Sequence, residues 1–232
     1  TQSMADLFDL KADGYFYTRL ANPTVAAFEG KVTELEGGVA AIGCASGMSA
    51  ATMMAFTICG AGDNIVSSSA IYGGTFNLFA VTLPKLGIII HSSSKYLDGH
   101  AAALGGVIVD GGNFNFKGNS RYAAFNIPDE SYHGLVYADL PAAQLATKCR
   151  VQMIRDMGAI MSPQNAFLSW LGCDTLALRM ERHASNAKKV AAYLSKHPKI
   201  DWVWHAALPV NKYHKLAEKY LPDGQGGMLS FG

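Results

Sequence analysis

The sequence predicts an α/β, doubly wound fold in which a mainly parallel sheet is covered by helices, with a smaller α/β domain at the C-terminal end. Apolar residues make up 50% of the 232 residues and charged residues only 16%, so the chain can bury a large core and is not disordered. Short, continuously apolar runs alternate with helical patterns, which is typical of strands that are buried on both faces.

The elements of the first half follow from local signals. Asn22-Pro23 combines a helix cap with a proline suited to a first helical turn, and Gly37-Gly38 ends that helix. Apolar runs and helical periodicity in the stretch that follows predict the other elements. Strands are expected at 39–44, 65–67, 88–90 and 105–109, and helices at 49–59 and 72–83.

The second half begins with an irregular stretch at 111–135. A helix is expected over 140–157, and Asp174 is expected to cap a long amphipathic helix. The strand expected at 200–204 then starts a new pattern, which indicates a second domain. We therefore expect a first domain over residues 23–185, preceded by an arm at 1–22, and a second domain over 186–232.

Composition excludes several classes of protein. The net charge is +1 and the Lys and Arg residues form no dense cluster, so no nucleic-acid partner is expected. The most apolar stretch, 50–61, is too short to span a membrane, and the N-terminus has no signal-peptide pattern. Four widely spaced cysteines make no CxxC pair, so we expect reduced, mostly buried thiols in a cytoplasmic protein. They are Cys44, Cys59, Cys149 and Cys173.

Ligands of open parallel sheets bind beyond the carboxyl ends of the strands, and three such ends are small and polar here. They are Ser46-Gly47-Met48, the stretch 67–74, and Ser92-Ser93-Ser94-Lys95. Hydroxyl groups, glycine-exposed amides and a helix N-terminus together form a cradle for an anion, and phosphate is the natural guest. Tyr72 adds a flat surface for a flat ligand.

Lys95 indicates which phosphate compound this site binds. Neither GxGxxG nor GxxxxGK[ST] is complete, GxSxG is missed, and the histidines and cysteines lack metal-binding spacing, so no metal is expected. Desolvation at the mouth of a buried strand favours a neutral amine, which attacks aldehydes. A phosphate cradle, a stacking ring and this lysine describe a pyridoxal phosphate (PLP) site. The alternative is an ordinary α/β domain with Lys95 on its rim.

Five stretches in a fixed order resemble the Cys/Met-metabolism family of PLP-dependent enzymes, also called the γ-family. They are 17–24, 35–38, 46–48, 72–75 and 91–100. The resemblance implies the PLP-dependent transferase fold of type I. Within the family the chain is most similar to O-acetylhomoserine sulfhydrylases, which implies a γ-replacement that makes homocysteine or methionine from O-acetylhomoserine and sulfide or a thiol.

The resemblance also implies roles for individual residues. Lys95 would bind the cofactor covalently, and Tyr72 would stack on its ring and assist catalysis. The arm would carry Tyr17 and Arg19 to the phosphate of a neighbouring subunit, in a homotetramer built as a dimer of dimers. The cofactor-binding residues implied are Tyr17, Arg19, Ser46, Gly47, Met48, Tyr72, Ser92, Ser94 and Lys95.

Two parts of the family pattern are absent. Near residues 88–89 the family carries a further segment with the aspartate that pairs with the pyridine nitrogen, and the second domain is truncated before the arginine that binds the substrate carboxylate. Either residues have been omitted from a longer chain, or a true deletion has left a non-catalytic assembly protein with this fold. Omission is favoured, because a sheet without its central strands leaves apolar surface uncovered. Methionine γ-lyase and cystathionine γ-synthase remain alternative activities.

Overall fold

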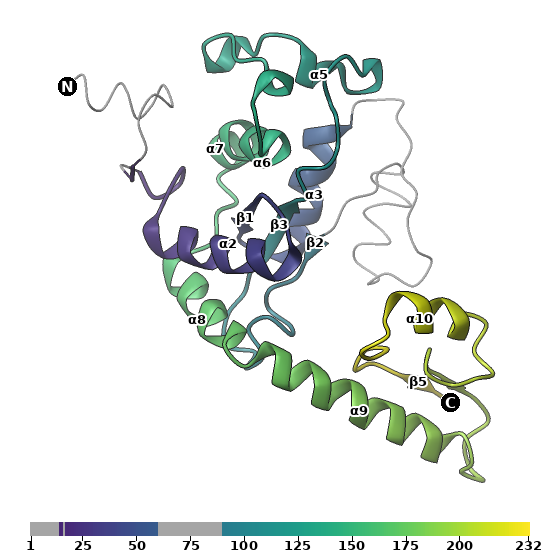
Figure 1. The fold of residues 1–232 in the computed structure, drawn as a ribbon. Coiled ribbons are helices and arrows are strands. Elements are labelled where there is room, and N and C mark those ends of the chain that lie inside the picture. The colour runs from purple at the N-terminus through teal and green to yellow at the C-terminus, as the bar shows by residue number, and fades with distance from the viewer. Residues whose placement is uncertain (1–13, 16, 60–89) are drawn as a thin grey trace. The chain divides into compact units, whose positions relative to one another are not determined.

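The computed structural model describes residues 14, 15, 17–59 and 90–232, drawn as the coloured ribbon in Figure 1. The strand predicted at 65–67 and the helix predicted at 72–83 lie outside the described residues. The chain divides into two compact units, Thr1–Gly172 and Cys173–Gly232. The predicted boundary at 185/186 instead falls inside the long helix α9 (Leu176–Leu194). This helix belongs wholly to the second unit, where it contacts β4 (Val203–Trp204).

The predicted ends of the first helix are confirmed. Helix α2 spans Pro23–Glu36, and the side chain of Asn22 accepts hydrogen bonds from the amides of Thr24 and Val25. Gly37 ends the helix with φ of 63°, a left-handed conformation that glycine adopts without steric cost. The first strand, β1 (Ala40–Cys44), and the next helix, α3 (Gly47–Ile58), also match the predictions closely.

Three strands form the sheet of the first unit in the order β1-β3-β2. Strand β3 (Gly106–Asp110) is antiparallel to both β1 and β2 (Ile90–His91), so β1 and β2 run parallel to each other. This reversal of β3 is not among the features predicted from the sequence. It arises because the link 92–105 forms turns rather than the crossover helix that a parallel neighbour needs.

Helices cover both faces of this sheet, as the apolar strands predict. Side chains alternate along β1, so Ile42 and Cys44 face one way while the Gly43 position faces the other. Ile42 and Cys44 join the main core with α3 and the 144–154 helix. A side chain at Gly43 would instead meet Val25 and Glu29 of α2. The sheet is therefore the middle layer of three.

The stretch 111–135 holds only short helices, close to the irregular structure expected. They are η2 (Ser120–Tyr122), α5 (Ala123–Asn126) and η3 (Glu130–Tyr132), followed by η4 (Tyr137–Asp139). The helix expected from residue 140 begins at 144, as α6 (Gln144–Lys148), the π-helix η5 (Cys149–Ile154) and α7 (Arg155–Met157). Its start is fixed from outside, because the Asp110 carboxylate accepts hydrogen bonds from the Leu145 and Ala146 amides at 3.0 and 3.1 Å.

The remaining elements are only partly as predicted. Helix α8 (Pro163–Cys173), helix α10 (His214–Tyr220) and strand β5 (Ser230–Phe231) have no counterpart in the sequence prediction. Strand β4 is shorter than expected and pairs antiparallel with β5. The predicted cap of α9 is displaced by one residue: the cap position is Thr175 rather than Asp174, and the Thr175 side chain makes no capping hydrogen bond.

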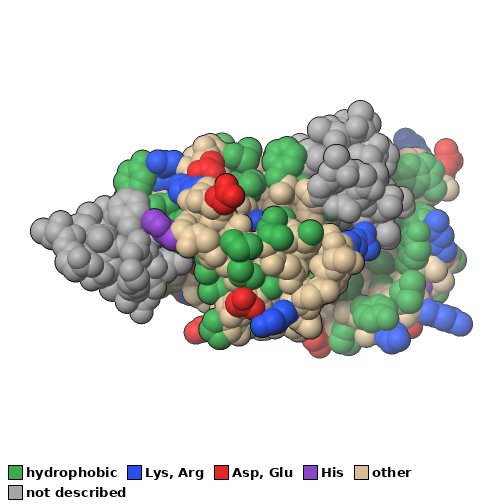
Figure 2. Space-filling model, turned by 90° about the horizontal axis from the view of Figure 1, so that it is seen from above, with side chains coloured by type: hydrophobic (Ala, Val, Ile, Leu, Met, Phe, Trp, Pro, Cys, Tyr) green, Lys and Arg blue, Asp and Glu red, His purple; other side chains and the backbone are tan. Residues whose placement is uncertain are grey.

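Surface and thiol properties agree with the composition. Figure 2 shows hydrophobic side chains across the described part of one face, with few charged side chains among them. All four cysteines are free; three of them are buried and Cys59 is half-buried, as expected.

Within the described ranges, no helix has both the length and the apolar character needed to cross a membrane.

Candidate functional site

The two polar stretches 46–48 and 92–95 lie at the same edge of the sheet. The last residues of β1 and β2, Cys44 and His91, pair with Gly106 and Val107 at the start of β3. Because β1 and β2 are parallel, the chain leaves both strands at this edge. The two stretches therefore lie beyond the carboxyl ends of strands, and binding of a ligand there stays a prediction.

Glycine allows the two stretches to touch across β3, although that strand separates β1 from β2. A Cβ atom on Gly106 would collide with the backbone carbonyl of Ser46. A Cβ atom on Gly47 would lie 2.7 Å from the Ser92 Cβ and 3.0 Å from the Ser92 Cα. The N-terminus of α3 therefore lies directly against Ser92.

Ser46 begins α3 through a reciprocal capping arrangement. Its hydroxyl accepts a hydrogen bond from the Ser49 amide at 3.0 Å, and the Ser49 hydroxyl accepts one from the Ser46 amide at 2.9 Å. Gly47 and Met48 occupy the first two helical positions, whose amides have no acceptor within the helix. The positive end of the helix dipole is thus directed at the edge where Ser92 lies.

The hydroxyl groups of Ser92 and Ser94 differ in their surroundings. The Ser94 hydroxyl accepts a hydrogen bond from the Gly105 amide at 2.9 Å and donates one to the Gly105 carbonyl at 3.2 Å. No hydrogen bond joins the Ser92 hydroxyl to another described residue. Gly105, whose buried amide is bound by Ser94, is not among the predicted site residues.

Lys95 extends from a turn that directly follows β2, and its side chain is exposed. The predicted desolvation of the Lys95 amine stays a prediction, because the stretch 60–89 lies outside the described residues. Tyr72, the other predicted catalytic residue, lies outside the described residues.

Asp98 lies at the end of this turn and is not among the predicted site residues. Its side chain is 1% exposed, and its Oδ2 accepts hydrogen bonds from the amides of His100 and Ala102 at 3.1 and 2.9 Å. The signal for Asp98 in the sequence is its position within the 91–100 motif. That signal is weak, because a short polar residue in a glycine-containing turn usually only stabilises the turn.

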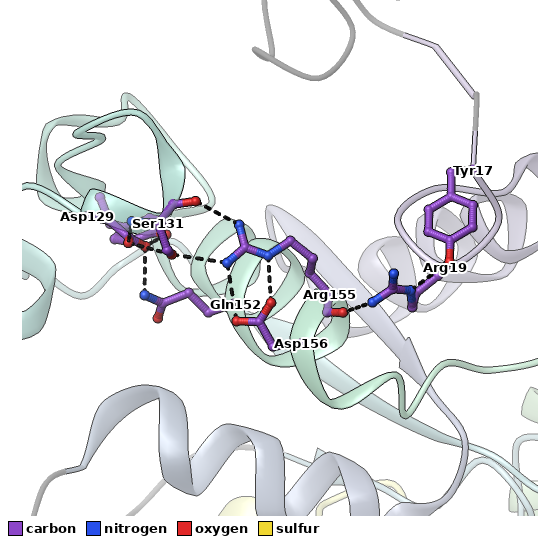
Figure 3. A network of polar contacts seen from close by, with 8 residues as sticks. Tyr17, Arg19, Asp129, Ser131, Gln152, Arg155 and Asp156 are labelled. Atoms are coloured by element: carbon purple, nitrogen blue, oxygen red, sulfur yellow. Dashed lines mark hydrogen bonds and ion pairs between the residues drawn. The ribbon is translucent and has the colours of Figure 1, made fainter.

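Tyr17 and Arg19 lie on the arm before α2, and their hydrogen bonds are made elsewhere than at this edge of the sheet. Arg19 Nε donates to the Tyr17 hydroxyl at 3.0 Å, and Arg19 Nη1 donates to the Arg155 carbonyl (Figure 3). Among the described residues of this one chain, neither side chain is hydrogen-bonded to the 92–95 turn. Within the described part, the structure therefore brings together Ser46, Gly47, Met48, Ser92, Ser94 and Lys95 but not Tyr17 and Arg19.

Arg19 joins a polar network around Asp129, also drawn in Figure 3. Desolvation acts to raise the pKa of Asp129, but hydrogen bonds from Tyr137, Ser131 and Gln152 outweigh it and lower that pKa. This network holds the η3 segment against the π-helix. It also includes Arg155, whose carbonyl accepts the hydrogen bond from Arg19 of the arm.

Two other features carry no chemistry of the predicted kind. A hollow of about 300 Å³ is lined by Pro23, Thr24, Ala27, Phe167 and Trp170, on α2 and α8. It is apolar and lacks the lysine and hydroxyl groups. Among the residues that the structure describes, no three His, Cys, Asp or Glu side chains are grouped to hold a metal ion.

Comparison with known proteins places these residues in a family. The model of the Cys/Met metabolism PLP-dependent enzymes matches the chain in two parts, residues 1–90 and 87–232. A homocysteine synthase from Schizosaccharomyces pombe is 38% identical, in an alignment of 303 residues that covers 97% of this chain and 71% of that protein. An O-acetyl-L-homoserine sulfhydrylase from Leptospira meyeri is 36% identical, covering 99% of this chain and 70% of that protein.

A solved structure is similar over nearly the whole chain. It is a putative O-acetylhomoserine (thiol)-lyase from Campylobacter jejuni that contains N'-pyridoxyl-lysine-5'-monophosphate, with a TM-score of 0.93 and 31% identity. The similarity covers 99% of this chain and 76% of that one. With the lysine turn, the helix N-terminus and both matches of the family model in agreement, the chain belongs to the Cys/Met metabolism family of PLP-dependent enzymes.

Proposed function

We propose that this protein is an O-acetylhomoserine sulfhydrylase, which forms homocysteine or methionine from O-acetylhomoserine and sulfide or a thiol. In this reaction the bond between the γ-carbon and the acetoxy oxygen breaks, acetate leaves with the electron pair, and sulfur forms the new bond. The observation that carries the proposal is the meeting of the Ser92–Lys95 turn with the N-terminus of α3. Sulfhydrylases and homocysteine synthases among the relatives support the choice of substrate.

The chemistry of the donor set fits PLP. Hydroxyl groups and helix N-terminal amides suit a phosphate dianion, and a primary amine three residues beyond Ser92 suits the cofactor's aldehyde. We assign Ser92, Ser94 and the amides of Gly47 and Met48 to the phosphate, and Lys95 to the aldehyde. Ser46 would contribute mainly by capping α3, because its hydroxyl already accepts the Ser49 amide.

The bound cofactor supplies an electron sink for carbanions next to the substrate nitrogen. Lys95 Nζ would have two tasks in the proposal: it would give way to the substrate amine, and as the free amine it would accept the α-proton of the substrate. After passing that proton on, the same amine could accept a β-proton. Tyr72 is proposed to stack on the cofactor and to assist departure of the acetoxy group. The N-terminus of α3 would hold the phosphate end of the cofactor through its helix dipole.

The proposed active assembly is a homotetramer built as a dimer of dimers, in which each active site contains residues of at least two subunits. Among the described residues, Arg19 donates hydrogen bonds to the Tyr17 hydroxyl and the Arg155 carbonyl, and both of these acceptors are neutral. The phosphate of a neighbouring subunit would supply an anionic partner. Low charge and exposed apolar side chains also suit an oligomer (Figure 2). The free cysteines support a cytoplasmic location.

A second candidate is a non-catalytic assembly protein with the same fold. It is favoured by the exposed Lys95 and by the family model, whose two matches meet at residues 87–90. The alignment to the S. pombe protein runs over 303 residues although this chain has 232, so that relative carries residues without a counterpart here. We propose that the junction marks the site of a missing internal segment.

Absorbance and product analysis test the two candidates. The enzyme, incubated with PLP, is expected to show a visible band that borohydride bleaches and that Lys95→Ala abolishes. Supplied with O-acetylhomoserine and sulfide it should release acetate and homocysteine, whereas methionine alone should remain unchanged. Breakdown of methionine would favour a γ-lyase, product formed only with cysteine would favour a cystathionine γ-synthase, and a band without any turnover would favour the assembly protein.

A further inference from the structure

We infer, building on the function proposed for Lys95, that Asp98 is a positioning residue for this lysine. Its buried carboxylate holds the backbone turn from which the exposed Lys95 side chain extends. The evidence lies in the main-chain bonds of the turn, in the two amides that the carboxylate binds, and in the packing of α8 against its end.

The Lys95 turn is closed by bonds between its own backbone groups. The Lys95 amide donates to the Ser92 carbonyl at 3.3 Å, the Asp98 amide to the Ser93 carbonyl at 2.9 Å, and the Gly99 amide to the Lys95 carbonyl at 2.8 Å. These bonds do not continue into a regular helix, so the turn ends abruptly at Asp98. Its geometry at that end depends on support from outside the turn.

The Asp98 side chain provides this support. Oδ2 accepts hydrogen bonds from the amides of His100 and Ala102, on either side of Ala101. Ala101 has φ of 54°, a left-handed conformation that residues with a side chain rarely adopt. The carboxylate therefore holds an unfavourable backbone segment in place, directly after the lysine turn.

Helix α8 fixes the same end of the turn from another direction. A Cβ atom on Gly172 would collide with the backbone carbonyls of both Leu97 and Asp98. At the other side, Ser94 is bonded to the backbone of Gly105. The backbone of Lys95 thus lies between two anchored positions, Ser94 and Asp98, while its side chain is left accessible to a ligand.

The second carboxylate oxygen determines which substitutions are informative. Asp98 Oδ1 is buried and has no hydrogen-bond partner among the described residues. Asparagine keeps the oxygen that accepts the two amides and replaces Oδ1 by an amide group of similar size. Alanine removes both hydrogen bonds. Asp98→Asn is therefore the conservative variant and Asp98→Ala the disruptive one.

The test uses the full chain and PLP itself as the probe. Each variant is incubated with PLP, reduced with borohydride and digested, and the modified Lys95 peptide is quantified by mass spectrometry. Because misplacement of a reacting group by about 1 Å reduces rates strongly, Asp98→Ala should label Lys95 at least about tenfold more slowly. Asp98→Asn should stay within about threefold of the wild-type labelling rate, since it keeps the acceptor.

Asn211→Ala is the matched control. Asn211 is also buried, in the second unit, and its side chain accepts the Tyr213 amide at 2.9 Å. Its removal should leave Lys95 labelling unchanged. Wild-type labelling rates in a folded Asp98→Ala variant, or a loss with Asp98→Asn equal to that with Asp98→Ala, would overturn the inference.

Amide hydrogen exchange gives a readout that needs no cofactor. In the wild-type protein, the amides of His100 and Ala102 should exchange at least about tenfold more slowly than in a peptide of the same sequence, because both are hydrogen-bonded. Unprotected amides in the wild type would overturn the inference even if Asp98→Ala failed to fold. If instead both amides are protected but the wild type takes up no PLP at Lys95, the proposed function fails and the role of Asp98 in the turn stands.

Discussion

Glu29 and Arg150 form an ion pair that joins α2 to the π-helix, with Arg150 Nη2 2.7 Å from Glu29 Oε2. The other oxygen of Glu29 accepts the Gly43 amide of β1 at 2.7 Å, and Arg150 Nη1 donates to the Leu20 carbonyl at 2.9 Å. One pair thus connects the arm, the first helix, the sheet and the π-helix. Burial raises the pKa of Glu29, although the Arg150 charge opposes that rise.

Replacement of Arg150 by alanine should destabilise the protein strongly. Glu29 would then be buried without its cation, and breaking a buried pair costs about 3 kcal/mol or more of the free energy of unfolding. Urea denaturation measures this change. Lys117→Ala is the control, because the Lys117–Asp139 pair is exposed and should contribute less than about 1 kcal/mol. Equal losses in the two variants would contradict the importance of burial.

Glu29 should also make stability depend on pH. A carboxyl whose pKa is higher in the folded than in the unfolded state holds its proton more tightly when folded. Its contribution to the free energy of unfolding is therefore largest at low pH, and it falls as pH rises from about 4 through the raised pKa.

The wild type minus Glu29→Gln difference in the free energy of unfolding isolates this effect, because other titrations cancel. It should decrease over that pH range and level off above it, as measured by urea denaturation at each pH. A difference that increases with pH would show that Arg150 outweighs burial and lowers the pKa.

The two serines of the lysine turn should respond differently to alanine. Ser94→Ala leaves the buried Gly105 amide without its acceptor and should lower the free energy of unfolding of the cofactor-free protein by about 1–2 kcal/mol. Ser92→Ala breaks no bond to a described residue and should leave that stability within about 0.5 kcal/mol. Both should weaken PLP binding, measured by titration of the visible band. Equal stability of the two cofactor-free variants would contradict the Ser94–Gly105 bond.

A methyl group at Gly47 should disrupt the site, whereas one at Gly30 should not. The Gly47→Ala Cβ would approach the Ser92 backbone within 3.0 Å, so the two turns must separate and PLP uptake should fall by about tenfold or more. Gly30 lies on the exposed side of α2 with no atom within 4 Å of the new Cβ. Gly30→Ala should stabilise the protein by about 0.5–1 kcal/mol with unchanged PLP uptake.

Local signals predicted some boundaries well and others poorly. Asn22 and Gly37 set the ends of α2 through contacts within a few residues, so the sequence shows them directly. The start of α6 escaped prediction because its cap, Asp110, comes from a strand far away in the sequence. Helix α8 also escaped, and with it the packing of Gly172 against the lysine turn.

From the sequence alone, the succession of α2, β1 and α3 and the strand β3 could be predicted, together with the family motifs and the polar turns that follow β1 and β2. These features depend on residue types at short spacing, and each leaves a local pattern. Only the tertiary structure decided the direction of β3, the exposure of Lys95 and the anchoring of its turn by Ser94 and Asp98. Those properties arise from backbone groups that meet across the sheet and α8, and a backbone amide or carbonyl is the same in every sequence.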